Sequence, residues 1–133
     1  MTALSGRCFC GAVAWATEGP VLWAGHCHCE SCRRATSAPF TSYLGVPRDS
    51  VTWQGDLSDH QTSGGRVLRQ FCGLCGTQMT YHSAAWPDET HLYAATLDDQ
   101  TRFIPEAHFH WAERRPWVRI NDDLPKHDGS ADA

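Results

Sequence analysis

Short runs in which apolar and polar residues alternate, separated by turn residues, recur along most of this 133-residue chain. Alternation with a period of two is typical of β-strands that bury one face. The pattern predicts strands over residues 12–17, 21–29, 40–46, 51–54, 66–71, 77–82 and 89–97. No amphipathic pattern extends over three helical turns, so the sequence predicts a mainly β domain.

The chain has the length of one domain and shows no internal repeat or low-complexity segment. We therefore expect a single domain over residues 1–125. The last residues, 126–133, are mostly polar, and we expect them to form a flexible C-terminal tail.

Charge and hydropathy exclude several classes of partner. The formal net charge is −4, whereas a general nucleic-acid binder would usually be basic. No apolar run approaches the roughly 18 residues of a membrane-spanning helix. The first residues lack a secretory pattern, so we expect a cytoplasmic protein with no nucleic-acid or membrane partner.

The seven cysteines are the main chemical signal. They fall into a CxC pair, a CxCxxC group and a CxxC pair: Cys8 and Cys10; Cys27, Cys29 and Cys32; Cys72 and Cys75. An odd number at such short spacings argues against disulfides, and clustered cytosolic cysteines more often bind metal. Four thiolates form a closed zinc site, and three leave one position open for chemistry.

The CxxC pair, Cys72 and Cys75, has the spacing of a zinc knuckle, and each cysteine is followed by a glycine. This pair needs two more ligands, and Cys8 with Cys10 is the remaining pair. The spacing leaves open an alternative, in which Cys72 and Cys75 share a metal with two cysteines of the CxCxxC group.

The CxCxxC group lacks a fourth cysteine, so its fourth ligand would be histidine, water or substrate. In an extended strand Cys27 and Cys29 share one face, and His26 and His28 point to the other. We therefore favour packing over metal ligation for the two histidines. Cys32 would return to the cysteine face through a tight turn or the start of a short helix.

Zinc bound by three thiolates carries one net negative charge and is a weak Lewis acid, so the site favours thiol chemistry over metal-hydroxide hydrolysis. Two arginines follow the group directly. Arg33 and Arg34 could bind a carboxylate of an anionic substrate, or they could balance the charge of the thiolates.

The three cysteine motifs, at residues 8–11, 26–33 and 71–77, resemble those of the glutathione-dependent formaldehyde-activating enzyme (GFA) family, which includes centromere-protein-V-like members. Weaker similarity at residues 96–99, 105–110, 116–117 and 122–125 extends the resemblance over about residues 5–125. It implies an Mss4-like β-tent, built from several small antiparallel sheets around zinc sites.

The resemblance also implies two Zn²⁺ ions per chain. A structural zinc would be held by four cysteines, and a second, labile zinc by the other three: Cys8, Cys10, Cys72 and Cys75; Cys27, Cys29 and Cys32. The family activity joins formaldehyde and glutathione to S-(hydroxymethyl)glutathione, or reverses this, as a carbon–sulfur lyase. The implied partner is a small thiol or thiol adduct, with glutathione as the family's example.

Such a reaction needs a proton donor for the developing alkoxide. By residue type and position in the chain the candidates are Tyr81, His82, His108 and His110, with Arg33 as a substrate-binding residue. Trp86, Trp111 and Trp117 could form the wall of a pocket.

Two other functions remain open at this stage: a zinc-stabilised protein-binding module without catalysis, and a thiol or zinc carrier. A fourth protein ligand on the second metal would favour the binding module, and an open position beside a pocket would favour the enzyme. The sequence also allows a homodimer.

Overall fold

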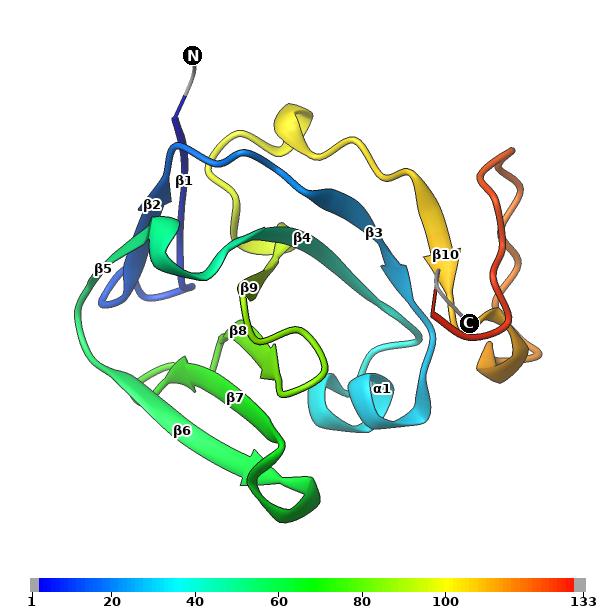
Figure 1. The fold of residues 1–133 in the computed structure, drawn as a ribbon, viewed down its shortest axis with the longest axis horizontal. Coiled ribbons are helices and arrows are strands. Elements are labelled where there is room, and N and C mark those ends of the chain that lie inside the picture. Colours follow the sequence, from blue (N-terminus) through cyan, green and yellow to red (C-terminus); the bar gives the residue numbers. More distant parts are fainter. Residues whose placement is uncertain (1–2, 131–133) are drawn as a thin grey trace.

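Two β-sheets form the protein in the computed structural model, which describes residues 3–130 (Figure 1). The smaller sheet has the strand order β1 (Leu4–Arg7), β2 (Ala14–Thr17), β5 (Val51–Gln54). The larger sheet has the order β10 (Ala107–Phe109), β3 (Trp23–Cys27), β4 (Thr41–Pro47), β9 (Glu89–Tyr93), β8 (Gln78–Ser83), β7 (Val67–Cys72), β6 (Leu57–Thr62).

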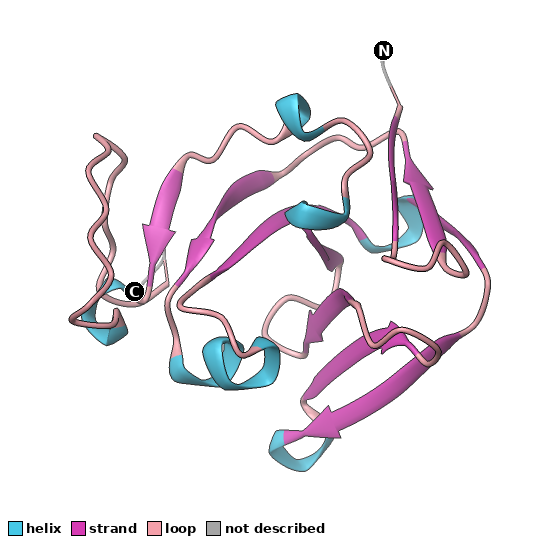
Figure 2. Ribbon diagram, turned by 180° about the vertical axis from the view of Figure 1, so that it is seen from behind, coloured by secondary structure: helices cyan, strands magenta, loops and turns pink. Residues whose placement is uncertain are grey.

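The prediction of a mainly β fold is confirmed. All strand pairs are antiparallel except β10 and β3, which run parallel. Among the described residues the one α-helix is α1 (Glu30–Thr36), which follows β3, and the other helical segments are short 3₁₀ turns (Figure 2).

Several boundaries differ from those expected. The sequence pattern did not predict β1 and β6. Strand β9 ends at Tyr93 because a 3₁₀ turn, Ala94–Thr96, follows it. Strand β3 ends at Cys27, since Cys29 already acts as the N-cap of α1.

The core lies where β4 and β9 pair, with Leu44 opposite Leu92 and both side chains fully buried. Trp15 from the smaller sheet and Met79 from β8 belong to the same cluster, so it joins the two sheets. Burial of these apolar side chains is the main stabilising contribution to the fold.

Two glycines let aromatic rings lie across the larger sheet. Gly45 pairs with Trp23, and a Cβ atom at Gly45 would collide with the Trp23 indole. A Cβ atom at Gly25 would likewise meet the ring of Phe109. Trp23 and Phe109 can therefore pack against each other, with ring centroids 5.6 Å apart.

Residues 125–129, at the C-terminal end of the chain, run beside β10 (Figure 1). The amides of His108 and His110 donate hydrogen bonds to the carbonyls of Pro125 and Gly129. We expected a flexible tail at 126–133; its residues 126–130 make these backbone contacts or lie next to them, and 131–133 lie outside the described residues. No helix in the described part of the chain has the length and hydropathy to cross a membrane.

Candidate metal centres and adjoining cavity

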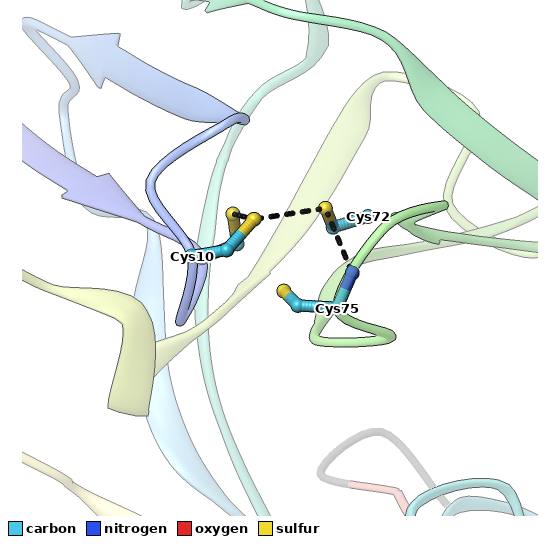
Figure 3. Close-up of side chains that lie close together, drawn as sticks. Cys10, Cys72 and Cys75 are labelled. Carbon is cyan, nitrogen blue, oxygen red and sulfur yellow. Dashed lines mark hydrogen bonds between the residues drawn. The ribbon is translucent and has the colours of Figure 1, made fainter.

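Four cysteines from two distant turns converge on one point (Figure 3). Cys8 and Cys10 follow β1, and Cys72 and Cys75 lie at the end of β7 and in the turn after it. Their sulfur atoms lie within 4.8 Å of one another, with 3.7 Å from Cys8 to Cys10 and 3.8 Å from Cys10 to Cys72. A tetrahedral site with Zn–S bonds of about 2.3 Å requires sulfurs about 3.8 Å apart, so this donor set fits zinc.

The local backbone holds these sulfurs in place. Gly11 and Gly76 each have a φ of +82°, which allows the chain to turn sharply behind the second cysteine of each pair. The Val13 amide donates a hydrogen bond of 3.3 Å to the Cys8 sulfur. The Thr77 hydroxyl and Cys75 sulfur are 3.2 Å apart, and this hydrogen bond lowers the pKa of Cys75 to about 5. Hydrogen bonds of this kind favour the thiolate form that binds metal.

The second group contains Cys27, Cys29 and Cys32, whose sulfurs also lie within 4.8 Å of one another. Cys27 ends β3, Cys29 is the N-cap of α1, and Cys32 lies in the first turn of the helix. The Cys32 amide donates a hydrogen bond of 3.3 Å to the Cys29 sulfur. The two cysteine groups are separate, so the structure does not support a metal shared between Cys72, Cys75 and this group.

The surroundings of Cys32 favour a thiolate. Hydrogen bonds from the Cys27 and Cys29 thiols, and one of 3.3 Å from the Tyr43 hydroxyl, lower the pKa of Cys32 to about 2. Arg69 Nη2 lies 3.9 Å from the same sulfur. The pKa of Cys27 is raised, because its thiol hydrogen-bonds to Cys29 and Cys32. These contacts favour the thiolate form of Cys32, and a bound cation would ionise the other two thiols.

The neighbouring histidines point away from the second group, as strand alternation predicts. His28 Nε2 lies 2.9 Å from Nδ1 of the buried His108, whose Nε2 donates a hydrogen bond of 2.9 Å to Asp122. His26 Nδ1 lies 2.8 Å from the Ser42 hydroxyl. Among the described residues, no histidine or carboxylate joins the three sulfurs, so the position of a fourth ligand is open.

A cavity of about 320 Å³ adjoins these three cysteines. Besides the cysteines, nine residues line it: Trp23, Tyr43, Tyr81, Trp86, Glu89, His91, Phe109, His110 and Ser130. Its volume lies at the lower end of the range for small-molecule sites, and its mostly aromatic lining is typical of them.

His91 is one of these lining residues and is 5% exposed. Its Nε2 is 2.9 Å from Oε1 of Glu89, and the same oxygen accepts a hydrogen bond of 2.9 Å from the Trp23 indole. Burial lowers the pKa of His91, although the hydrogen bond to Glu89 opposes this shift. The ring of His91 stacks on Tyr81, with centroids 5.7 Å apart.

The structure brings only some of the expected site residues together. Tyr81, His110 and Trp86 line the cavity, and Arg33, His82 and His108 do not. Arg33 Nε donates to the His28 carbonyl, and His82 Nε2 lies 3.3 Å from Gln70 Oε1. Trp111 packs against His28 and His108, and Trp117 is 68% exposed; neither lines the cavity.

Sequence reasoning missed Tyr43, Glu89 and His91. The signal that could have found them is the alternation in residues 89–93, where Glu89, His91 and Tyr93 share one face of β9 and Leu92 faces the core. A polar and aromatic face on a strand of the larger sheet indicates a site rather than packing alone.

Comparison with known proteins agrees with this geometry. Residues 3–113 match the family described as glutathione-dependent formaldehyde-activating enzyme. A Halomonas elongata protein provisionally named as such an enzyme is 28% identical over 129 residues, which cover 88% of this chain and 80% of that protein. An uncharacterized lyase of Schizosaccharomyces pombe is 31% identical over 83 residues, covering 61% of this chain and 58% of the lyase.

A solved structure shares the fold. It is a Rhodobacter sphaeroides protein with a TM-score of 0.62 and 23% identity, and the match covers 76% of this chain and 97% of that one. The family match extends over most of the chain and includes all seven cysteines of the two groups. The chain therefore belongs to the glutathione-dependent formaldehyde-activating enzyme family.

Proposed function

We propose that this protein is a zinc-dependent carbon–sulfur lyase or synthase, which joins a small thiol to an aldehyde or cleaves the adduct. The observation that carries the proposal is the open group of three cysteines beside a cavity. A binding module with a purely structural second metal would need a fourth protein ligand, and none lies among the described residues at that group. Glutathione and formaldehyde, named by the family, are the first pair to test.

Each group of cysteines has a different part in the proposal. The four-cysteine group would hold a structural zinc, because its sulfurs already have tetrahedral spacing. Cys27, Cys29 and Cys32 would hold the second zinc, which when bound supplies a soft site that keeps a substrate thiol ionised. Seven cysteines without a disulfide fit a reducing compartment such as the cytoplasm.

The reaction itself balances without an oxidant or a reductant. The sulfur lone pair forms a bond to the aldehyde carbon, the π pair of the carbonyl moves to oxygen, and the proton lost by the thiol ends on that oxygen. In the reverse direction the hydroxyl proton leaves and the C–S bond breaks. The enzyme therefore needs a group that exchanges a proton with the adduct oxygen.

We assign this proton exchange to His91. The Glu89 carboxylate accepts the proton on Nε2, which fixes the tautomer and leaves Nδ1 free to accept a proton. Burial lowers the pKa of His91, which favours the neutral ring that a base requires. In the direction of adduct formation the same nitrogen returns the proton to oxygen.

The test is the rate of exchange between free formaldehyde and its glutathione adduct, measured by NMR with the zinc-loaded protein. We expect Cys32→Ser to abolish the enzymatic rate and His91→Gln to lower kcat by about 10²- to 10⁴-fold. His82→Gln is the matched control, because His82 lies on the neighbouring strand and outside the cavity. The proposal would be contradicted if the zinc-loaded wild-type protein did not accelerate the exchange of formaldehyde with any thiol tested.

A further inference from the structure

Apart from the three cysteines, the cavity beside them is lined mainly by uncharged side chains. Five of its twelve lining residues are aromatic: Trp23, Tyr43, Tyr81, Trp86 and Phe109. Its one acidic residue is Glu89, and no lysine or arginine is among the described residues that line it. The lining offers apolar surface and neutral hydrogen-bonding groups, and it contains no arginine or lysine partner for a carboxylate.

The nearby arginines are engaged elsewhere. Arg33 Nε donates a hydrogen bond of 3.1 Å to the His28 carbonyl, and Arg34 pairs with Glu30 at 3.0 Å on the surface of α1. Arg69 is buried, lies over the ring of Tyr81 and directs Nη2 toward the Cys32 sulfur. Arg69 therefore balances the charge of the thiolate group and does not face the cavity.

An anionic ligand would find no lysine or arginine side chain among the described residues of this lining. Glutathione carries two carboxylates, which would lose water, gain no arginine or lysine partner and be repelled by Glu89 and by the thiolates. An uncharged aromatic ring would instead bury apolar surface against Trp86 and Phe109 and could make edge-to-face contacts with them.

We propose that the preferred substrates are uncharged aromatic thiols or their aldehyde adducts, with the ring in the aromatic cavity and the sulfur at the open cysteine group. This inference rests on the proposed function of the same site and specifies its substrate class. The cavity, of about 320 Å³, has room for one aromatic ring with a short linker.

The experiment compares benzyl mercaptan with 4-(mercaptomethyl)benzoate, by calorimetric titration of the zinc-loaded protein. The two ligands present the same thiol and the same ring, so the difference in their affinities reports the effect of the carboxylate alone. We expect the benzoate to bind about tenfold more weakly or worse, which is about 1.4 kcal/mol. Glutathione is titrated in parallel, and turnover of each thiol with formaldehyde is followed by NMR exchange.

Three variants measure how individual side chains contribute to ligand binding. Trp86→Ala should weaken binding of benzyl mercaptan, and Trp117→Ala is the matched control because Trp117 is exposed and outside the cavity. Glu89→Gln should reduce the difference in affinity between benzyl mercaptan and the benzoate, because it removes the charge that repels the carboxylate. Thermal melts of each variant verify that it folds.

The outcomes distinguish this inference from the proposed function. Equal or tighter binding of glutathione or the benzoate overturns the inference, and glutathione turnover would then leave the proposed function standing. Selective binding of benzyl mercaptan without turnover of any thiol supports the assignment of the cavity and overturns the proposed function. Selective binding of benzyl mercaptan together with its turnover supports both the substrate class and the proposed function.

Discussion

The sulfur atoms of Cys10 and Cys72 lie 3.8 Å apart, although 62 residues separate them in the chain. A metal at this point links the turn after β1 to the turn after β7, and so connects the two sheets. Structural zinc contributes on the order of 10 kcal/mol to folding, which is comparable with the whole stability of a domain.

We therefore expect Cys72→Ser to be largely unfolded at 25 °C, and a strong chelator to unfold the wild type. The measurement is a thermal melt followed by circular dichroism. Cys29→Ser is the control, since it alters only the second group and should keep a cooperative melt. A Cys72→Ser protein that melts within a few degrees of wild type would contradict a structural metal at this point.

The Tyr43 hydroxyl is expected to tune the second metal. It donates a hydrogen bond of 3.3 Å to the Cys32 sulfur, and loss of such an outer partner typically costs 10- to 100-fold in metal affinity. Tyr43→Phe should weaken zinc binding at the three-cysteine group by about that factor, as measured by competition with a chromophoric chelator. Tyr93→Phe should have a smaller effect, because the Tyr93 hydroxyl contacts Tyr43 at 3.2 Å instead of the sulfur. Equal zinc affinity in wild type and Tyr43→Phe would exclude this role.

Gly45 is expected to be indispensable for the cavity wall. Its missing Cβ leaves room for the Trp23 indole, which donates a hydrogen bond to Glu89. The same carboxylate oxygen is the partner of His91. Gly45→Ala should displace the indole and destabilise the fold by about 1–3 kcal/mol, as overpacking usually does. In urea unfolding the cost should shrink in a Trp23→Ala background, because the colliding ring is gone. An unchanged cost in that background would show that the strain lies elsewhere.

His82 should make stability depend on pH. Burial lowers its pKa from 6.5 to about 4, so between these values the unfolded chain binds the proton more readily. Above pH 6.5 the ring of His82 is neutral in both states, and its contribution to the free energy of unfolding is fully present. As the pH falls from 6.5 toward 4, the unfolded chain takes up the proton first, and this stability is lost. His82→Gln should flatten this part of the curve of unfolding free energy against pH. NMR titration checks the pKa directly, and a value near 6.5 in the folded protein would contradict the expectation.

The local part of the site could be predicted from the sequence, because short spacings keep the sulfurs within each cysteine motif close together; which motifs share a metal was settled by the fold. Alternation along residues 26–29 also predicted that His26 and His28 turn away from the cysteines. After Cys29 the sequence allowed a tight turn or the start of a short helix, and the structure has a helix of seven residues there.

The cavity could not be predicted, since it depends on the register between strands. His91 lines the same cavity as the cysteines because β9 lies between β4 and β8, with His91 opposite Gly45 on one side and Tyr81 on the other. No spacing in the sequence encodes those pairings. His82 was a candidate by residue type alone, and it lies next to Tyr81 on the opposite face of β8.

We propose that one chain holds two zinc ions, one in the closed and one in the open group of cysteines. Native mass spectrometry of freshly purified, reduced protein measures this directly. We expect two zinc ions in the wild type and one in a folded Cys32→Ser variant. A wild-type protein that is folded without metal, with all seven cysteines free or oxidised, would contradict it.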